Sequence, residues 1–141
     1  MSSTLKISEA ASLALHTTVL LAANADRLLS THEIAETLGV SEAHLAKVMQ
    51  RLHHAGLVRS IRGPKGGFGL AKPGARIALL DVYQAIEGPL GAETCLLGRR
   101  VCRGKKCVLG GLLGAVNKQV RDYLSKTKLS ELTHVYQCAR G

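Results

Sequence analysis

Four cysteines are the residues of this chain best suited to chemistry. Cys95, Cys102 and Cys107 are separated by six and then four residues, and Cys138 follows near the carboxyl end. Thiolates are soft ligands that favour iron–sulfur clusters, zinc and copper(I), and close thiols can also form a disulfide. A secreted disulfide framework is disfavoured because we expect no signal peptide and because cytosolic thiols are expected to stay reduced. Four interpretations remain open: an iron–sulfur cluster, a thiol–disulfide switch, a zinc site or inert cysteines.

The stretch from 90 to 106 has little hydrophobic periodicity, so we expect a loop around these cysteines. Five basic residues lie in it: Arg99, Arg100, Arg103, Lys105 and Lys106. Positive charge lowers the pKa of a thiol and offsets the negative charge of a thiolate-ligated cluster. The same positive charge would equally activate a thiol for disulfide exchange. The basic residues therefore do not distinguish an iron–sulfur cluster from a thiol–disulfide switch.

A second kind of chemistry, the binding of a polyanion, is indicated by the uneven charge. The chain has 19 Lys and Arg against 10 Asp and Glu, a formal net charge of +9. Between Ser41 and Arg76 the single acid is Glu42, whereas seven residues are basic: Lys47, Arg51, Arg59, Arg62, Lys65, Lys72 and Arg76. Nucleic-acid phosphates are the natural partner of such a stripe.

Cap and turn signals place this stripe on a helix-turn-helix. Ser30 followed by Glu33 fits a capping box, Gly39 can end a short helix, and Ser41 can cap the next. In that second helix one apolar stripe recurs at three- and four-residue spacing: Leu45, Val48, Met49 and Leu52. The opposite face then presents Ala43, Ala46, Lys47 and Gln50.

A glycine-rich loop follows that helix. Gly56 ends the helix, and two strand-like runs, 57–61 and 68–71, flank the segment from Arg62 to Gly67. The pattern predicts a β-hairpin wing. Gly63, Gly66 and Gly67 would let its backbone turn and approach a duplex closely.

The rest of the chain supplies supporting helices. Apolar periodicity predicts a first core helix over 8–23, another over 77–87 and a last one over about 107–125. The last has an apolar side that needs a partner surface: Leu109, Leu112, Leu113, Val116, Val120 and Leu124. We therefore expect a mainly α fold, with a winged helix-turn-helix domain over 1–88, a cysteine-bearing loop over 89–107 and a dimerisation helix with its tail over 108–141.

Several function classes are excluded. Polar residues interrupt the apolar start, and no run reaches the roughly 18 residues of a membrane helix, so we expect a soluble, cytoplasmic protein. The six histidines are scattered, without a carboxylate or nucleophile at catalytic spacing, so no enzyme is expected. With one Phe, three Tyr and no Trp, the chain lacks the aromatic platform of single-strand or RNA binders.

Two segments carry a resemblance to a known family. The runs 45–52 and 55–68, the second containing the wing motif from Arg62 to Phe68, resemble the bacterial winged-helix transcription regulators that include IscR, NsrR and CymR. The similarity extends from 5–8, through 79–82 and 85–88, to the cysteine loop and the following helix. It implies a homodimer joined through the long C-terminal helix and bound to a pseudo-palindromic operator in double-stranded DNA.

The resemblance also implies contacts with DNA. Lys47, Gln50 and His44 would face base edges, Arg62 would enter the minor groove, and Arg59 and Lys65 would hold phosphate. The full predicted interface is Ser41, Ala43, His44, Lys47, Gln50, Arg51, Arg59, Arg62, Lys65, Gly66 and Gly67. Relatives with a cluster often have a glutamate where this chain has Ala46, so its sequence preference is expected to differ.

Several members of that family hold an iron–sulfur cluster with three loop cysteines, which implies that role for Cys95, Cys102 and Cys107. The positions that supply the fourth cluster ligand in relatives have different residues in this chain. The histidine that some relatives place three residues after the last cysteine is Gly110 here, and the acidic residue of others is Ser12. The candidates are then Ser12, Glu9, His16, Cys138 or a non-protein ligand.

The sequence thus predicts a DNA-binding transcriptional regulator, expected to be a repressor. Its affinity for DNA would be controlled by a cysteine-ligated iron–sulfur cluster, of two-iron or four-iron type, that senses nitric oxide, redox state or iron–sulfur status. The alternative is a cluster-free winged-helix repressor controlled by a thiol–disulfide switch. This alternative requires only two close cysteines.

Overall fold

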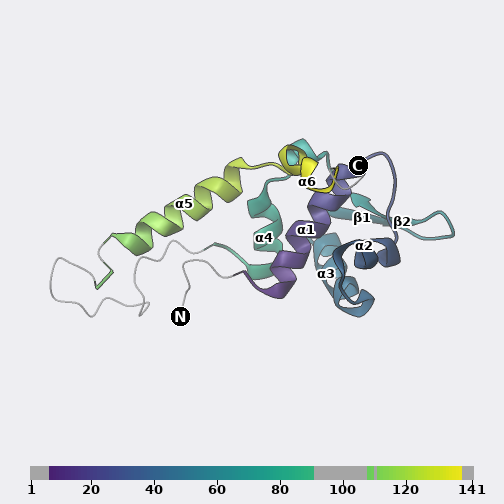
Figure 1. The fold of residues 1–141 in the computed structure, drawn as a ribbon, viewed down its shortest axis with the longest axis horizontal. Helices are drawn as coiled ribbons and strands as arrows, with labels where there is room; N and C mark the ends of the chain where they lie inside the picture. Colours follow the sequence, from purple (N-terminus) through teal and green to yellow (C-terminus); the bar gives the residue numbers. More distant parts are fainter. Residues whose placement is uncertain (1–6, 91–107, 110, 138–141) are drawn as a thin grey trace.

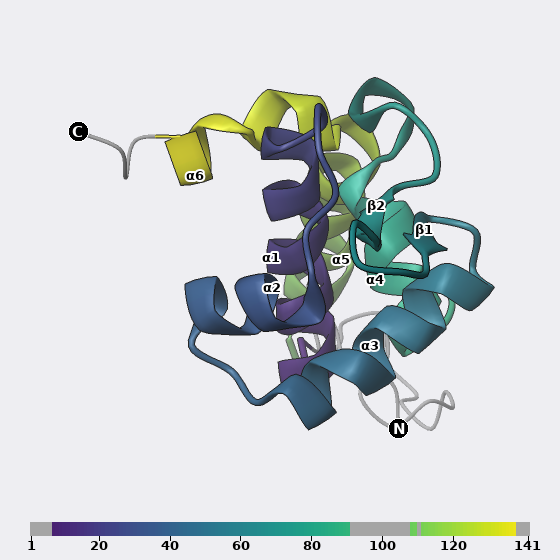
Figure 2. The ribbon, with the colours of Figure 1, turned by 90° about the vertical axis from the view of Figure 1, so that its right-hand side faces the viewer.

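The computed structural model describes residues 7–90, 108–109 and 111–137. Its centre is helix α1 (Glu9–Ala23), which begins where the Ser8 hydroxyl accepts a hydrogen bond from the Ala11 amide, 3.1 Å away. Buried side chains lie on more than one side of α1, since Val19 is buried as well as Leu13 and Thr17. This is because α2, α3, α4, β2 and the C-terminal elements all pack on α1. Figure 2 shows α1 between these elements.

The helix-turn-helix consists of α2 (Thr31–Leu38) and α3 (Glu42–His54). Ser30 caps α2 by accepting from the Glu33 amide at 3.1 Å. The two helices are joined at Gly39, whose φ of 67° is one that glycine adopts without strain. Both predicted caps and the predicted turn are present.

The wing is an antiparallel pair of strands, β1 (Val58–Ile61) and β2 (Gly67–Leu70). Val58 pairs with Leu70 and Ile61 with Gly67, so the connection lies between Ile61 and Gly67. Strand β1 begins one residue later than the predicted run 57–61, and β2 is shifted by one residue towards the N-terminus from the predicted run 68–71. The hairpin projects from the body at the end opposite α5 (Figure 1).

After the wing come a short 3-10 turn, η1 (Gly74–Arg76), and helix α4 (Leu79–Glu87). Helix α4 starts two residues later than predicted because Ile77 and Ala78 are extended. They pair with the chain after α5: the Leu129 amide donates to the Ile77 carbonyl and the Leu79 amide to the Thr127 carbonyl, both at 3.0 Å.

Helix α5 (Leu112–Lys126) begins five residues later than predicted, with Gly111 at its N-cap. Leu109 therefore precedes the helix, and Gly114 lies within its first turn. The apolar side chains expected along this helix do not all have the same environment. Leu113 and Leu124 are buried within the subunit, whereas Leu112 is 57% exposed.

The C-terminal elements η2 (Leu129–Leu132) and α6 (His134–Gln137) return to α1. Leu129 is fully buried and joins the same apolar cluster as α1, α3 and α4. No pattern in the sequence predicted this return. None of the helices that the structure describes is long and apolar enough to span a membrane.

Candidate nucleic-acid interface

Helix α3 is held so that one face is buried and the other is open. Its apolar stripe is at most 2% exposed in Leu45, Val48, Met49 and Leu52. The Ser41 hydroxyl accepts from the His44 amide at 3.1 Å and fixes the first turn. Helix α3 is thus anchored to the core along its buried stripe.

The outward residues of α3 lie where the sequence placed them. Ser41, Ala43, Lys47 and Gln50 are exposed, and His44 is half-buried. They occupy one surface of the helix, because the buried stripe takes the opposite one. This surface has the exposure needed to enter a major groove, and the contacts themselves stay a prediction.

Arg51 is placed differently from the other predicted contacts. Its residue is exposed, yet one guanidinium nitrogen, Nη2, donates to the backbone carbonyl of Ile86 in α4. At least one of its N–H groups is therefore used inside the subunit. This bond was not predicted, since nothing in the spacing of Arg51 and Ile86 signals it.

The wing carries its cations on the exposed connection and on β1. Arg62 and Lys65 are exposed in the connection, and Arg59 is exposed on β1, where its Nε donates to the Leu70 carbonyl at 3.2 Å. That bond lays the Arg59 side chain across the hairpin. Arg62 and Lys65, in contrast, extend from the part of the wing that is farthest from the core.

A backbone bridge fixes the wing to the helix-turn-helix. The Leu29 amide donates to the Phe68 carbonyl at 3.0 Å, and the Phe68 amide donates to the Leu29 carbonyl at 2.7 Å. Leu29 is directly before the Ser30 cap of α2, so wing and helix-turn-helix share one frame. Leu29 was not predicted to have this role. The sequence feature that could have indicated this role is the apolar pair Leu28-Leu29 directly before the capping residue Ser30.

Acidic residues near this surface are grouped around α2. Glu33 accepts from Arg27 at 2.9 Å, and this hydrogen bond is the main reason that the pKa of the Glu33 carboxyl is lowered. His32 lies 3.5 Å from the Glu36 carboxylate and 3.7 Å from that of Glu42. The negative charge is thus beside the start of α3, and the later part of α3 and the wing present positive charge.

Of the candidate ligands for a metal or cluster, the structure describes Glu9, Ser12 and His16. Cys95, Cys102, Cys107 and Cys138 lie outside the described residues. Within the described ranges, no three His, Cys, Asp or Glu side chains are grouped in a way that would hold a metal ion.

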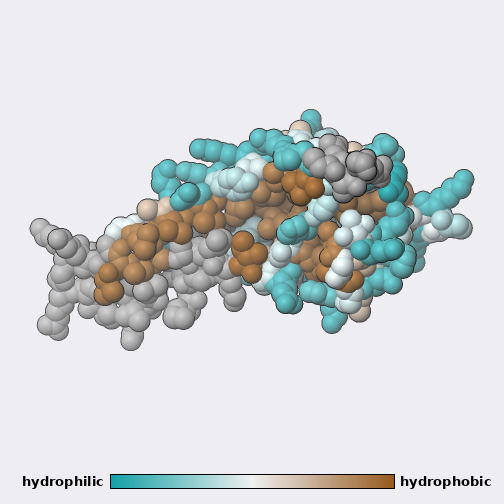
Figure 3. All heavy atoms as spheres, viewed as in Figure 1, coloured by the Kyte–Doolittle hydropathy of each residue, from teal (hydrophilic) through white to brown (hydrophobic). Residues whose placement is uncertain are grey.

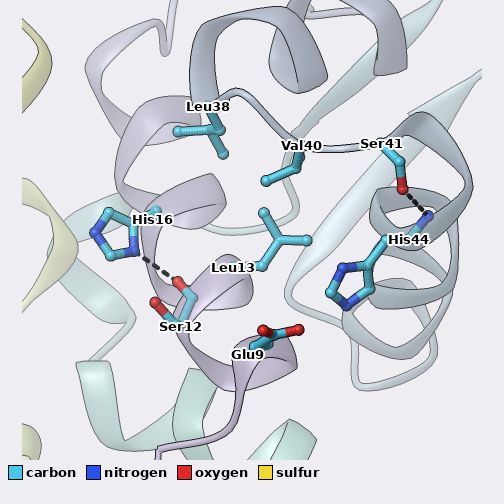
Figure 4. Close-up of a pocket in the computed structure, with 8 residues that line it drawn as sticks. All are labelled: Glu9, Ser12, Leu13, His16, Leu38, Val40, Ser41 and His44. Atoms are coloured by element: carbon cyan, nitrogen blue, oxygen red, sulfur yellow. Dashed lines mark hydrogen bonds between the residues drawn. The ribbon is translucent and has the colours of Figure 1, made fainter.

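The three remaining candidates for a fourth ligand share one surface of α1. Glu9, Ser12 and His16 line a hollow of about 460 Å³, together with Ser41 and His44 at the start of α3 (Figure 4). The His16 ring nitrogen Nδ1 donates a hydrogen bond to the Ser12 carbonyl oxygen, 2.6 Å away. The hollow therefore places these three side chains next to the start of α3, and their role as ligands stays a prediction.

A second exposed surface lies on and just before α5. Val108 is 91% exposed and Leu112 57%, and hydrophobic residues form a band along this part of the molecule (Figure 3). Exposed apolar surface of this kind is typical of a protein–protein contact.

Comparison with known proteins agrees with this geometry. The model of the Rrf2 family, described as an iron-dependent transcriptional regulator, matches residues 7–135. The HTH-type transcriptional regulator IscR of Photorhabdus laumondii is 33% identical over 103 residues, which are 72% of this chain and 62% of that protein.

Two solved structures are similar over nearly their whole length. CymR, the global cysteine regulator of B. subtilis, is 29% identical with a TM-score of 0.79, over 93% of this chain and 98% of that one. The oxidized form of Staphylococcus aureus CymR is 28% identical with a TM-score of 0.74, over 92% and 96% of the two chains. The mainly α winged-helix fold predicted from the sequence is confirmed.

Proposed function

The chain belongs to the Rrf2 family of transcriptional regulators, and we propose that it is a homodimeric repressor whose operator affinity is controlled by a cysteine-ligated iron–sulfur cluster. As a member of this family it is a DNA-binding winged-helix regulator and not an enzyme. The observation that carries its DNA-binding part is the exposure of Lys47 on α3 and of the cations on the wing, which the Leu29 bridge joins to the helix-turn-helix.

In this proposal α3 enters the major groove, and Lys47, Gln50 and His44 face base edges. Arg62 enters the adjacent minor groove, where a narrow A-tract concentrates negative potential. Lys65 and Arg59 hold phosphates, which adds affinity but no sequence preference. The exposed position of Arg62 and Lys65 in the wing connection supports this division.

The dimer is proposed to form through α5. A two-fold contact uses the same patch on both subunits, and the exposed Leu112 and Val108 provide such a patch. Two recognition helices related by a two-fold axis would meet successive major grooves of a pseudo-palindromic site.

Cys95, Cys102 and Cys107 would hold the cluster, with the fourth ligand from Glu9, Ser12, His16, Cys138 or outside the protein. A cluster supplies a redox-active group that reacts with oxygen and nitric oxide. Support comes from the donor set itself and from the iron-dependent description of the family. Glu9, Ser12 and His16 share their hollow with Ser41 and His44, so a ligand there would lie next to the recognition helix.

The second candidate is control by a thiol–disulfide switch without a cluster. It is favoured by the similarity to a CymR structure in an oxidized form. The cluster needs three cysteines and the switch only two, and the two candidates differ in whether iron is present.

Anaerobic purification decides between them. Iron and acid-labile sulfide are counted per chain, the visible spectrum is followed during addition of nitric oxide or oxygen, and binding to the protein's own promoter duplex is measured. The cluster proposal expects a coloured protein that loses its iron in Cys102→Ser, with Arg99→Gln as a control outside the ligand set. A colourless, iron-free protein that still binds its promoter would favour the disulfide candidate. Failure to retain any duplex at moderate ionic strength would refute DNA-binding control altogether.

A further inference from the structure

The C-terminal end of α4 receives side-chain hydrogen bonds from three other helices or their caps. Arg51 of α3 donates to the Ile86 carbonyl, and the Ser8 hydroxyl, at the N-cap of α1, donates to the Glu87 carboxylate. Arg121 of α5 donates to the Leu90 carbonyl at 2.9 Å. We call residues 86–90 the α4 junction. It lies where the recognition helix, the central helix and the exposed C-terminal helix are connected.

The Arg51 bond has a clear physical basis. Ile86 is in the last turn of α4, where carbonyls have no partner within the helix and the helix dipole is negative. The chain leaves α4 at Gly88, whose φ of 81° ends the helix and whose amide bonds to Gln84. The Ile86 carbonyl is thus open to a cation, and a hydrogen bond from a charged donor is stronger than a neutral one.

Arg51 lies beside an open part of the surface between α3 and α4. A hollow of about 520 Å³ lies between the end of α3 and α4, lined by Gln50, Arg51, His53, His54 and Ala55 on one side and Ala85 on the other. The hollow lies on the surface beside the buried contact between the two helices, so at this end other side chains do not fill the space between them. The Arg51 guanidinium reaches α4 from the edge of this hollow.

We infer that Arg51 is a positioning residue, which fixes the angle of the recognition helix against α4 and does not hold DNA phosphate. The α4 junction then passes a displacement of α1 or α5 on to α3, because all three are bonded to the same five residues. This inference rests on the proposed DNA-binding function and replaces the predicted DNA contact of Arg51. It also deepens the proposed control, since Cys95 follows Leu90 by five residues in the sequence.

A salt titration distinguishes positioning from phosphate contact. Arg51→Met and Lys65→Met both replace a cation with an uncharged chain, and each is measured on the promoter duplex and on a random duplex of equal length. A lost phosphate contact weakens both duplexes alike and reduces the slope of log K against log salt by about 0.9 for each contact. A lost positioning bond weakens promoter binding, by about tenfold for one charge-assisted bond, and leaves the slope and the random duplex unchanged.

We expect the first pattern for Lys65→Met and the second for Arg51→Met. Equal loss on both duplexes with a reduced slope in Arg51→Met would overturn the inference. If the wild-type chain itself retained no duplex, the proposed function would fail and this inference with it. Thermal unfolding and the exchange of the α3 amide hydrogens separate a changed helix angle from a lost fold.

A double-mutant cycle tests whether the junction connects α5 to α3. Arg121→Met should change promoter affinity although Arg121 lies on α5, and this change should be smaller in the Arg51→Met background because the connection to α3 is already removed. Additive effects of the two substitutions, or no effect of Arg121→Met, would overturn this part of the inference.

Discussion

The α-carbon of Gly66 faces the carbonyl oxygen of Ile61 so closely that a Cβ at residue 66 would lie 2.0 Å from that oxygen. Real Cβ atoms do not approach an oxygen at this distance, so only glycine fits this turn. The Gly66 amide also donates to the Gly63 carbonyl at 2.9 Å. The position of Arg62 and Lys65 in the wing therefore depends on the absence of a side chain at residue 66.

Gly66→Ala is expected to displace the wing connection and to weaken promoter binding more than tenfold, with only a small loss of thermal stability because the wing tip lies outside the core. Binding is measured by fluorescence anisotropy and stability by circular dichroism. Gly111→Ala, at the start of α5, is the matched control, since a Cβ added there would have no described atom within 4 Å. Unchanged binding by Gly66→Ala would show that the wing does not need this turn.

Arg62→Ala and Lys65→Ala should have different effects on DNA binding. Arg62→Ala should remove preference for the promoter with the fold intact, because a minor-groove contact reads sequence-dependent groove width. Lys65→Ala should weaken all duplexes alike and flatten the salt dependence. The same response of both variants in a salt titration would contradict this division of roles.

Ser41 caps α3 and is also a predicted DNA contact, and substitution can separate the two. Ser41→Ala removes the hydrogen bond to the His44 amide and should cost about 1 kcal/mol of stability. Ser41→Asp keeps a capping oxygen and favours the helix dipole, so stability should be retained. Its added negative charge beside the duplex should nevertheless weaken DNA binding. Thermal melts and anisotropy on both variants test this, and strong DNA binding by Ser41→Asp would place Ser41 away from the interface.

Leu112→Lys should dissociate the proposed dimer without unfolding the subunit, because this side chain is 57% exposed within one subunit. Leu113→Ala, at a position that is 7% exposed, should instead lower the stability of the subunit by about 2 kcal/mol or more. Sedimentation equilibrium gives the association state, and thermal unfolding gives the stability. A Leu112→Lys variant with the association constant of the wild type would move the dimer contact away from this face.

Tyr136 provides a test of pH dependence. Burial raises the pKa of its phenol, and its hydroxyl has no hydrogen-bond partner among the described residues. The folded state keeps the phenol neutral, so the unfolded state loses its proton first as pH rises above about 10, and the free energy of unfolding should fall from there. Tyr136→Phe should reduce that fall and leave neutral-pH stability equal or higher. Tyr123→Phe, at a side chain that is 58% exposed, is the control and should change neither.

The sequence by itself determined the local elements around the proposed interface. Ser30, Gly39 and Ser41 act through neighbours only a few residues away, so their caps and turn could be predicted from spacing. The stripe of α3 from Leu45 to Leu52 was likewise predictable, since a helix with one apolar side must bury that side. With the face of α3 fixed in this way, the outward position of Lys47 and Gln50 followed.

Only the tertiary structure decided how these elements are joined. The Leu29–Phe68 bridge, the return of Leu129 to α1 and the bond from Arg51 to Ile86 connect residues that are far apart in the chain. No local propensity specifies such pairs, because they depend on how helices pack and which backbone groups are left without partners. The start of α5 at Leu112 shows the same limit, because a glycine such as Gly111 can lie inside a helix or at its N-cap, and its position in the sequence does not decide which.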